Sequence, residues 1–377
     1  MKGTRRAARN AKQRNKVRYA VLGLGHISQV AMLPAFAHAT RNSELAALVS
    51  GDAAKRRKLS RRYGVPAYGY EASQELFESG DVDAVYIGLP NHLHCEYSVL
   101  AANAGVHVLC EKPMAVSAAE CERMIQAAQD HRVKLMIGYR LHFEEANLRA
   151  LEIARSGKLG DPRIFSSTFS MQVKAGNIRT QEAAGGGTLY DIGIYCLQAA
   201  RQVFGSDPVE VLAMSAQGDD PRFREVDEMT SAILRFPGNR FAAFTSSFGA
   251  ADVSAYRIVG TKGDLRVEPA YEYQGHLAHH LTLAGRSRTR RFGKRDQFGP
   301  ELIYFSDCVL RDREPEPSGL EGMIDVKIIE ALQFAAQSGR SVPLPAFPRE
   351  RKPALRQGRR LPPVRKPSLV RAESASR

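Results

Sequence analysis

The sequence predicts a two-domain α/β protein, with a doubly wound parallel sheet followed by an α+β domain whose sheet is mainly antiparallel. Strand-like runs alternate with amphipathic helical patterns over residues 17–140. After one helical stretch from residue 141, strands follow one another with only short turns between them. The length of 377 residues also exceeds what one hydrophobic core usually holds. We therefore expect a first domain over residues 17–140 and a second over residues 141–345.

The net charge of +14 is concentrated at the two ends of the chain. Residues 1–18 hold eight Lys and Arg and no acidic residue, and residues 349–377 hold ten against two acidic residues. These segments together carry +16, so the part between them sums to about −2. We expect a basic, disordered arm over residues 1–16 and a basic, disordered tail over residues 346–377. Because the folded body is nearly neutral, we expect no nucleic-acid partner.

Composition also bears on where the protein works. No segment approaches the roughly 18 consecutive apolar residues of a membrane span, and the basic N-terminus lacks the apolar stretch of a secretory signal. The five cysteines form no C-x-x-C pair, and Cys110 and Cys196 lie in apolar runs, which suits a reducing compartment. We expect a cytoplasmic protein without membrane contact, and we predict no metal site.

The first strand, Val17–Leu22, ends in the turn Gly23-Leu24-Gly25-His26-Ile27-Ser28, and a helical pattern follows. In a dinucleotide-binding turn the first Gly permits the bend, the second lets the backbone approach the pyrophosphate, and the third position must be small. Ser28 replaces the third Gly. The turn predicts cofactor contacts from its first five residues, although by itself it also fits a purely structural turn. Phosphates would bind the free amides of the helix N-terminus.

The second strand, Leu45–Val49, ends where an acidic residue would hold the ribose of NAD. Here Ser50 and Gly51 follow the strand, and a basic run begins at Lys55. A hydroxyl and cations at this place favour a 2′-phosphate, so we predict NADP in preference to NAD, with these three residues as contacts. Except for Lys55, the residues of the basic run are equally well explained as the solvated face of a helix.

The third strand, Asp83–Leu89, runs into Pro90 and Asn91. Asn91 either caps the helix that begins there or contacts the nicotinamide ribose. His94 follows one helical turn later, so its side chain is expected on the same side of the helix as that of Asn91. We therefore include Leu89, Asn91 and His94 among the predicted cofactor contacts.

The next strand runs directly into Glu111, Lys112 and Pro113. Ligands bind beyond the carboxyl ends of parallel strands, so Lys112 is predicted to face the ligand crevice. Pro113 restricts Lys112 to extended geometry, which aims its ammonium. Lys112 is a candidate catalytic cation; taken alone, the tripeptide also fits a surface lysine at a strand end. A helix from about Ser117 to His131 and a strand over Leu135–Gly138 complete the first domain.

The second domain is predicted to begin with a helix over His142–Gly157. Five strands are then expected, over Arg163–Val173, Glu210–Ala216, Thr230–Phe236, Phe241–Phe248 and Tyr256–Val259. Within this half, three glycines precede Thr188, a predicted N-cap, and a helix that places Asp191 and Tyr195 one turn apart on one face. A nearby ammonium such as Lys112 would favour proton transfer at the Tyr195 hydroxyl. The alternative is a helix whose Tyr packs in the core and whose Asp favours the dipole.

Taken in order, the motifs G-L-G-H-I-S, S-G-D-A-A-K, L-P-N-H-L-H, C-E-K-P-M-A, M-I-G-Y-R and G-G-G-T-L-Y-D-I-G-I-Y resemble the Gfo/Idh/MocA oxidoreductases over roughly residues 17–345. The resemblance implies that Lys112, Asp191 and Tyr195 are catalytic and that the Lys112–Pro113 bond is cis. It implies cofactor contacts at Gly23, Gly25, Ser50, Lys55, Tyr70, Asn91, Glu111, Lys112 and Arg140.

The Tyr at position 195, with Ser50 and Lys55, resembles the glucose-fructose oxidoreductase branch, whose members use NADP on sugars. This implies hydride transfer between nicotinamide and a sugar or polyol, in a homodimer or homotetramer. Two departures leave the substrate open: the export signal of periplasmic members is missing, and Asn177-Ile178-Arg179 stands where several relatives have a Trp-Arg pair. Dihydrodiol, inositol or xylose dehydrogenation, and a non-catalytic nucleotide sensor, remain alternatives.

Overall fold

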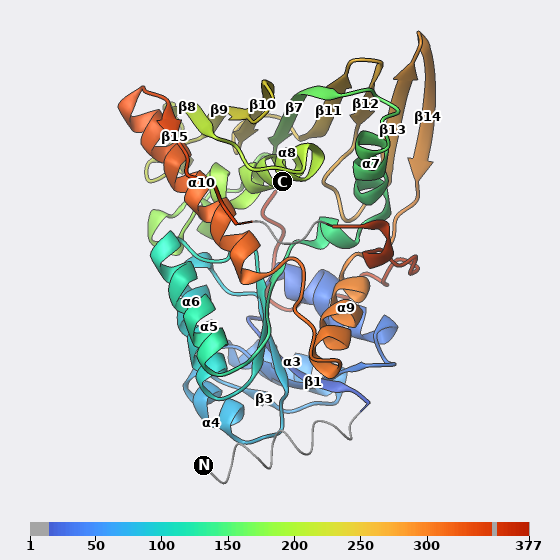
Figure 1. The fold of residues 1–377 in the computed structure, drawn as a ribbon. Helices are drawn as coiled ribbons and strands as arrows, with labels where there is room; N and C mark the ends of the chain where they lie inside the picture. The colour runs from blue at the N-terminus through green and yellow to red at the C-terminus, as the bar shows by residue number, and fades with distance from the viewer. Residues whose placement is uncertain (1–14, 349–352, 377) are drawn as a thin grey trace.

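The computed structural model describes residues 15–348 and 353–376, which form two sheets arranged along the long axis of the molecule (Figure 1). Most of the basic arm predicted over residues 1–16 lies outside the described residues. The same holds for residues 349–352 and 377 of the predicted tail.

The first sheet has six parallel strands in the order β3-β2-β1-β4-β5-β6. The chain order reverses between β1 and β4, and a crevice at such a switch point is where open parallel sheets bind ligands. The bounds of the strands are β1 Val17–Leu22, β2 Ser43–Val49, β3 Ala67–Tyr68, β4 Ala84–Ile87, β5 His107–Glu111 and β6 Leu135–Gly138. The predicted doubly wound sheet is confirmed.

Helices from both halves of the chain cover this sheet. Those from the first half are α2 Leu33–Ala35, α3 Ala53–Tyr63, α4 Ser73–Glu78, α5 His94–Asn103 and α6 Ala118–Asp130. Helix α9, Phe298–Leu310, comes from far along the chain and packs on β1 and β2. Tyr19 on β1 and Ser306 on α9 share a buried hydrogen bond of 2.7 Å between their hydroxyls. The sequence pattern over residues 17–140 did not reveal this cover.

The second sheet has nine strands in the order β14-β13-β12-β11-β7-β10-β9-β8-β15. Its neighbouring strands are antiparallel except for the parallel pair β7 and β10. The strands are β7 Pro162–Ser170, β8 Glu210–Ala216, β9 Met229–Phe236, β10 Arg240–Ser247, β11 Val253–Gly260, β12 Gly263–Val267, β13 Leu277–Leu283, β14 Arg286–Phe292 and β15 Val342–Pro343. The mainly antiparallel sheet is confirmed, but β12 to β15 were not predicted.

Helices α7 Glu145–Arg155, α8 Ile194–Phe204 and α10 Gly319–Ser338 complete the structure. Along β9, exposed and buried residues alternate strictly, so one face of the sheet packs on the core and the other is open. Helix α10 contacts α6 and β6 of the first half as well as α8 and β8 of the second. It therefore ties the two sheets together, as Figure 1 shows.

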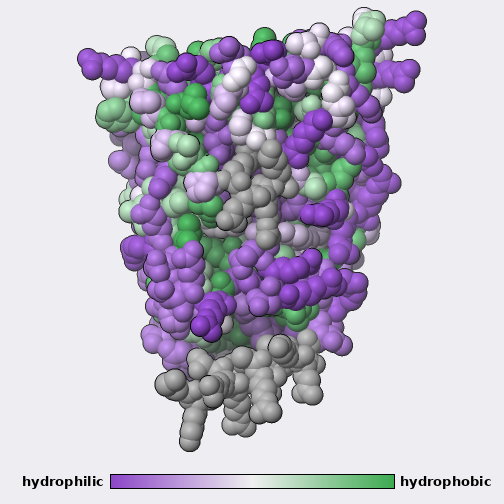
Figure 2. All heavy atoms as spheres, in the orientation of Figure 1, coloured by the Kyte–Doolittle hydropathy of each residue, from purple (hydrophilic) through white to green (hydrophobic). Residues whose placement is uncertain are grey.

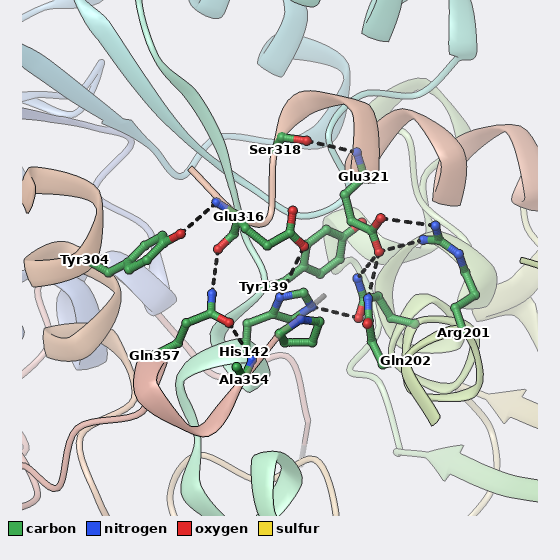
Figure 3. Close-up of polar contacts among 12 residues, drawn as sticks. Tyr139, His142, Arg201, Gln202, Tyr304, Glu316, Ser318, Glu321, Ala354 and Gln357 are labelled. Atoms are coloured by element: carbon green, nitrogen blue, oxygen red, sulfur yellow. Dashed lines mark hydrogen bonds and ion pairs between the residues drawn. The ribbon is translucent and has the colours of Figure 1, made fainter. Parts of the chain in front are cut away.

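A buried polar network lies where α10 meets both halves (Figure 3). Arg201 on α8 is fully buried and forms ion pairs with Glu321 and Asp325 on α10. The hydroxyl of Tyr139, just after β6, donates to Asp325 Oδ2 at 2.6 Å. Gln357 extends the network by donating to the Glu316 carbonyl at 2.8 Å. Since a buried charge requires such partners, the network specifies how the two halves dock.

The disorder predicted for residues 346–377 does not hold for the described residues 353–376. This segment runs back along the molecule and makes specific contacts, and the C-terminus lies between the two sheets in Figure 1. Val370 is 6% exposed, and both its backbone N–H and its carbonyl bond to the side chain of Gln29. Composition suggested disorder because the segment is basic and rich in proline, but its few apolar residues find partners on the folded body.

Hydrophilic residues cover most of the face shown in Figure 2, and hydrophobic residues appear among them in smaller groups. Within residues 15–348 and 353–376, no helix combines the length and the apolar character needed to cross a bilayer.

Candidate active site

A cavity of about 480 Å³ opens between the two sheets, at the carboxyl ends of β1, β2, β4 and β5. Its wall combines the glycine turn after β1 with the ends of the other strands and with residues of the second half. The sequence-predicted residues that line it are Gly23, Leu24, Gly25, His26, Ile27, Ser50, Lys55, Tyr70, Leu89, Asn91, Glu111, Lys112, Arg140, Asp191 and Tyr195. The structure thus brings together residues that lie up to 172 positions apart, from Gly23 to Tyr195.

The glycine turn has the geometry that a dinucleotide requires. Gly23 has a φ of +90°, and a Cβ there would lie 2.4 Å from the Gly88 carbonyl oxygen. A Cβ on Gly25 would meet nothing within 4 Å, so the space beside this backbone is open for a ligand. Ser28, at the third position, donates from its hydroxyl to the Gly23 carbonyl at 2.6 Å. It therefore closes the turn instead of disrupting it, and the following helical turn presents its amino end to the cavity.

Ser50 and Lys55 line the cavity just beyond the carboxyl end of β2. The nearby Asp52 caps α3, because its Oδ1 accepts from the backbone N–H groups of Ala54 and Lys55 at 2.7 and 3.1 Å. These backbone hydrogen bonds, with that from Lys55 the larger cause, lower the pKa of Asp52. Its carboxylate is thus engaged by the helix, and a hydroxyl and an ammonium remain at the cavity. This arrangement suits a 2′-phosphate better than a free 2′-hydroxyl.

Two predicted cofactor contacts do not line the cavity. Gly51 lies against Tyr70, where a Cβ would come within 3.3 Å of the ring, so it makes room for Tyr70 and does not reach the ligand space. His94 is 1% exposed, and its ring nitrogens lie 2.8 Å from the Pro113 carbonyl and 3.0 Å from the Leu89 carbonyl. Burial lowers the pKa of His94. Neither residue lines the cavity as predicted: His94 is buried behind the cavity wall, and Gly51 is exposed beside Tyr70.

Asn91 lines the cavity, but it does not cap the following helix. Its side-chain N–H donates to the Gly185 carbonyl at 2.7 Å. Gly185 has a φ of +74°, and a Cβ there would lie 2.4 Å from a Val116 methyl carbon. The glycine-rich loop of the second half therefore packs closely against the loop after β4. Of the two roles predicted for Asn91, capping is wrong.

Lys112, at the end of β5, reaches across to the second half. Its Nζ donates to the Asp191 backbone carbonyl at 2.7 Å and to Asp191 Oδ1 at 3.1 Å, and it lies 4.9 Å from the centre of the Tyr195 ring. The peptide bond before Pro113 is cis, as expected. Burial acts to lower the pKa of Lys112, but Asp191 and, to a smaller extent, Tyr195 and Glu111 act in the opposite direction and together raise the pKa. Lys112 is therefore a fixed cation at the cavity, as predicted.

Asp191 also binds a second cation, Arg179, a contact that the sequence did not predict. Arg179 Nε lies 2.5 Å from Asp191 Oδ2. Burial acts to raise the pKa of Asp191, but Arg179 and then Lys112 lower it well below its usual range. Arg179 is the last residue of the Asn177-Ile178-Arg179 segment noted in the sequence, but only the fold brings it to the carboxylate. Asp191 is therefore an ionised anchor between two cations.

Tyr195 stands between two cationic side chains. Arg140 Nε donates to the Tyr195 hydroxyl oxygen at 3.2 Å, and the Arg140 guanidinium carbon lies 4.9 Å from the ring centre. Arg140 is itself held by Gln297, whose Oε1 accepts from its Nη1 at 2.7 Å. Arg140, predicted as a cofactor contact, thus lines the cavity and also contacts the phenol.

The helix that carries Asp191 and Tyr195 begins differently from the prediction. Thr188 holds the predicted N-cap position, but its backbone angles are helical and its side chain caps no backbone N–H; its hydroxyl accepts from Ser246 at 3.1 Å instead. A π-helical turn over Leu189–Gly193 precedes α8. Such turns often occur at functional sites. Both side chains nevertheless face the cavity, as the predicted helix required.

Glu111 lines the cavity beside Lys112. Burial raises its pKa, and the Tyr86 hydroxyl donates to its Oε1 at 2.8 Å, which opposes that shift.

Aromatic and other residues from the second half also line the cavity, and sequence reasoning missed them. They include Phe169, Met171, Tyr271, Glu272, Tyr273, Phe298 and the C-terminal residues Ser374, Ala375 and Ser376. No spacing rule links them to the motifs.

The residues present fit a nicotinamide dinucleotide. The open space at Gly25, the hydroxyl and ammonium at Ser50 and Lys55, and the polar group around Tyr195 lie along one continuous cavity. Its size falls within the range of cofactor sites. Among the described residues, no group of three or more His, Cys, Asp and Glu side chains could hold a metal ion.

Comparisons with known proteins agree with this geometry. The model of an oxidoreductase family with an NAD-binding Rossmann fold matches residues 17–139, and the model of the GFO/IDH/MocA C-terminal domain matches residues 147–266. A D-xylose 1-dehydrogenase (NADP(+)) of Haloarcula marismortui is 32% identical over 338 residues, which cover 88% of this chain and 94% of that protein.

Solved structures are similar over the same region. The aldose-aldose oxidoreductase from Caulobacter crescentus, complexed with glycerol, is 39% identical with a TM-score of 0.84, and the match covers 87% of this chain and 100% of that chain. A 3-ketoreductase from Actinomadura kijaniata, in complex with NADP and TDP-benzene, is 27% identical with a TM-score of 0.78, covering 85% and 98%.

Proposed function

Because the chain belongs to the Gfo/Idh/MocA family of oxidoreductases, we propose that it transfers hydride between NADP and a hydroxyl-bearing carbon of a sugar or polyol. The observation that carries this proposal is the meeting of Lys112, Asp191 and Tyr195 at one end of the dinucleotide cavity. A protein that only sensed nucleotide would need the cofactor site but not this trio. The relatives' names, a xylose dehydrogenase and an aldose-aldose oxidoreductase, support a sugar as the substrate.

When bound, the nicotinamide supplies a carbon that accepts or donates hydride, and the protein supplies binding, orientation and proton transfer. In the oxidative direction, Tyr195 would act in its deprotonated form, with the phenolate oxygen taking the proton of the substrate hydroxyl while hydride passes from the carbinol carbon to the oxidised nicotinamide. In the reductive direction the same oxygen returns the proton. Arg140, which already donates to this oxygen, is placed to stabilise its charged form.

Lys112 and Asp191 act together in this mechanism. Lys112 stabilises negative charge that develops on the substrate oxygen, and a preorganised ammonium in a partly dry site serves this well. Asp191 keeps Lys112 charged and in place, and we propose that it also orients a substrate hydroxyl. Arg179 fixes the other oxygen of the same carboxylate. The remaining proposed cofactor contacts are the glycine turn, Ser50, Lys55, Tyr70, Leu89, Asn91, Glu111 and Arg140.

An activity screen tests the proposal. Purified protein is assayed with NADP⁺ across aldoses and polyols, and nicotinamide absorbance reports turnover. We expect at least one sugar to be oxidised and the Tyr195→Phe variant to lose that turnover while still binding NADPH. Full turnover by Tyr195→Phe would remove the phenol from the mechanism. A Tyr63→Phe variant is the control, since Tyr63 ends α3 and is not part of the cavity wall.

We also propose that the chain forms a homodimer or homotetramer through the open face of the second sheet. Large hydrophobic side chains on this face are exposed, among them Met214 (76%), Ile164 (52%), Ile233 (50%) and Phe241 (47%). A contiguous exposed apolar surface of this kind is typical of an interface. Sizing of Ile233→Glu against the unaltered chain tests this, and an unchanged size would contradict it.

We also propose a role for each domain and a cellular location. We assign residues 17–140 to cofactor binding and residues 141–345 to substrate binding and assembly. The five cysteines are all free and buried, which supports a reducing, cytoplasmic setting.

A further inference from the structure

The cavity is lined by three residues from near the C-terminus, Ser374, Ala375 and Ser376, which no motif of the sequence singled out. They belong to residues 366–376, which we call the C-terminal strap. The strap passes the glycine turn, where Gln29 contacts both Leu24 and Val370, and runs on toward the region between the two sheets, where Figure 1 marks the C-terminus. Both of its ends are fastened to elements that form the site.

The first fastening is on the helical turn that follows the glycine turn. Gln29, which is 1% exposed, donates from Nε2 to the Val370 carbonyl at 3.0 Å and accepts from the Val370 N–H at 2.8 Å. The same Nε2 also donates to the Leu24 carbonyl at 2.9 Å. One buried amide therefore ties the strap to the backbone of the dinucleotide-binding turn.

The second fastening is on the other half of the molecule. The Lys174 N–H donates to the Ala375 carbonyl at 2.9 Å, and Val173 pairs with Ser376 in an antiparallel bridge. Val173 lies just beyond β7 and is fully buried. The strap thus spans from the first half to the second, across the cavity that lies between them.

Between these fastenings, Arg371 lies near the predicted 2′-phosphate position. Its Nη1 is 3.5 Å from Asp52 Oδ2. Its side chain is 70% exposed, so part of the guanidinium faces solvent. Asp52 is the residue that follows Ser50 and Gly51 and caps α3 beside Lys55. Without a neighbouring cation, its carboxylate would repel a 2′-phosphate bound at Ser50 and Lys55. The Arg371 guanidinium, beside that carboxylate, offsets its charge.

We propose that the C-terminal strap is part of the NADP site, in which it forms the outer wall of the cleft and Arg371 supplies a cation for the 2′-phosphate. This inference rests on the proposed function, because it assigns a new determinant to the same cofactor site. Nucleotide that enters or leaves on this side must displace the strap. Binding and strap closure are therefore coupled, and each stabilises the other.

Titration of the full chain with NADPH and NADH tests the role of Arg371. We expect Arg371→Ala to raise the Kd for NADPH roughly tenfold, as for the loss of one cation beside a phosphate, and to change the Kd for NADH less than about twofold. Arg365→Ala is the matched control, since Arg365 is an exposed arginine of the same tail outside the cavity wall. Equal losses for both nucleotides, or none, would overturn the assignment of Arg371.

Limited trypsin digestion tests closure without any substitution. NADPH should slow cleavage after Arg371, as measured by mass spectrometry, while cleavage after the exposed Arg340, at the turn before β15, proceeds unchanged. Unaltered cleavage after Arg371 in saturating NADPH would overturn the proposed coupling between NADPH binding and closure of the strap. If the unaltered chain bound neither NADPH nor NADH, the proposed function itself would fail. If the chain bound NADPH tightly, but Arg371→Ala had an unchanged Kd and NADPH did not slow cleavage after Arg371, only the role proposed for the strap would be overturned.

Discussion

The Asp191 carboxylate binds two cations at once: Oδ1 lies 3.1 Å from Lys112 Nζ, and Oδ2 lies 2.5 Å from Arg179 Nε. Lys112 comes from the parallel sheet, whereas Asp191 and Arg179 come from the second half. The carboxylate therefore couples the position of the catalytic ammonium to the docking of the two halves.

Replacement of Lys112 by Ala should lower turnover by at least about 100-fold, because charge on the reacting oxygen loses its stabilising ammonium. NADPH binding should remain measurable, since the glycine turn, Ser50 and Lys55 are untouched. Steady-state kinetics with the best sugar, together with NADPH titration, provide the measurement. Lys158→Ala, at an exposed turn far from the cavity wall, is the control. Unchanged turnover in Lys112→Ala would remove this residue from the mechanism.

Replacement of Arg179 by Gln should move the acidic limb of the pH profile of kcat/KM to higher pH. Arg179 is the largest influence that lowers the pKa of Asp191 against the effect of burial. In the folded protein the depressed pKa keeps Asp191 ionised through the acidic range, and its contribution is lost only as the pH falls through that value. Without Arg179 the carboxyl protonates at higher pH, so Lys112 loses its anchor earlier. Arg163→Gln, on an exposed strand position, should leave the profile unchanged.

Replacement of Lys55 by Ala should raise the Kd for NADPH roughly tenfold and leave the Kd for NADH nearly unchanged. Lys55 lines the cavity beside Ser50, where the 2′-phosphate is expected. Lys58→Ala is the control, since Lys58 belongs to the same basic run but lies outside the cavity wall. It shows whether the effect comes from a specific contact of Lys55 or from the positive charge of the whole run. If both variants weakened both nucleotides alike, the preference for NADP would have another origin.

Replacement of Arg201 by Met should lower the free energy of unfolding by about 3–5 kcal/mol, because Glu321 and Asp325 would be left buried without their cation. Burial already raises the pKa of Asp325 to about 6, although Arg201 opposes it. Arg235→Met removes an ion pair with Glu210 in which the Arg side chain is 52% exposed, and should cost about 0–1 kcal/mol. Chemical denaturation measures both. Similar losses for the two variants would mean that the buried network does not hold the halves together.

Local chemistry explains why much of the fold could be predicted. The strand at Val17–Leu22 and the one at Leu135–Gly138 have the predicted bounds, since short apolar runs between turn residues determine such strands. By contrast, β14 has six exposed residues of seven and reads as a charged loop, so its pairing with β13 had no signal in the pattern. Its position depends on backbone hydrogen bonds to a neighbouring strand, which the alternation of side chains does not encode.

The sequence by itself determined the parallel sheet, the glycine turn and the presence of Lys112, Asp191 and Tyr195, because each depends on residues a few positions apart. Only the tertiary structure decided that Arg179 anchors Asp191, that His94 is buried behind the cavity wall, and that residues 374–376 line the cleft. These contacts join residues distant along the chain, and packing of the two halves, not local propensity, brings them together.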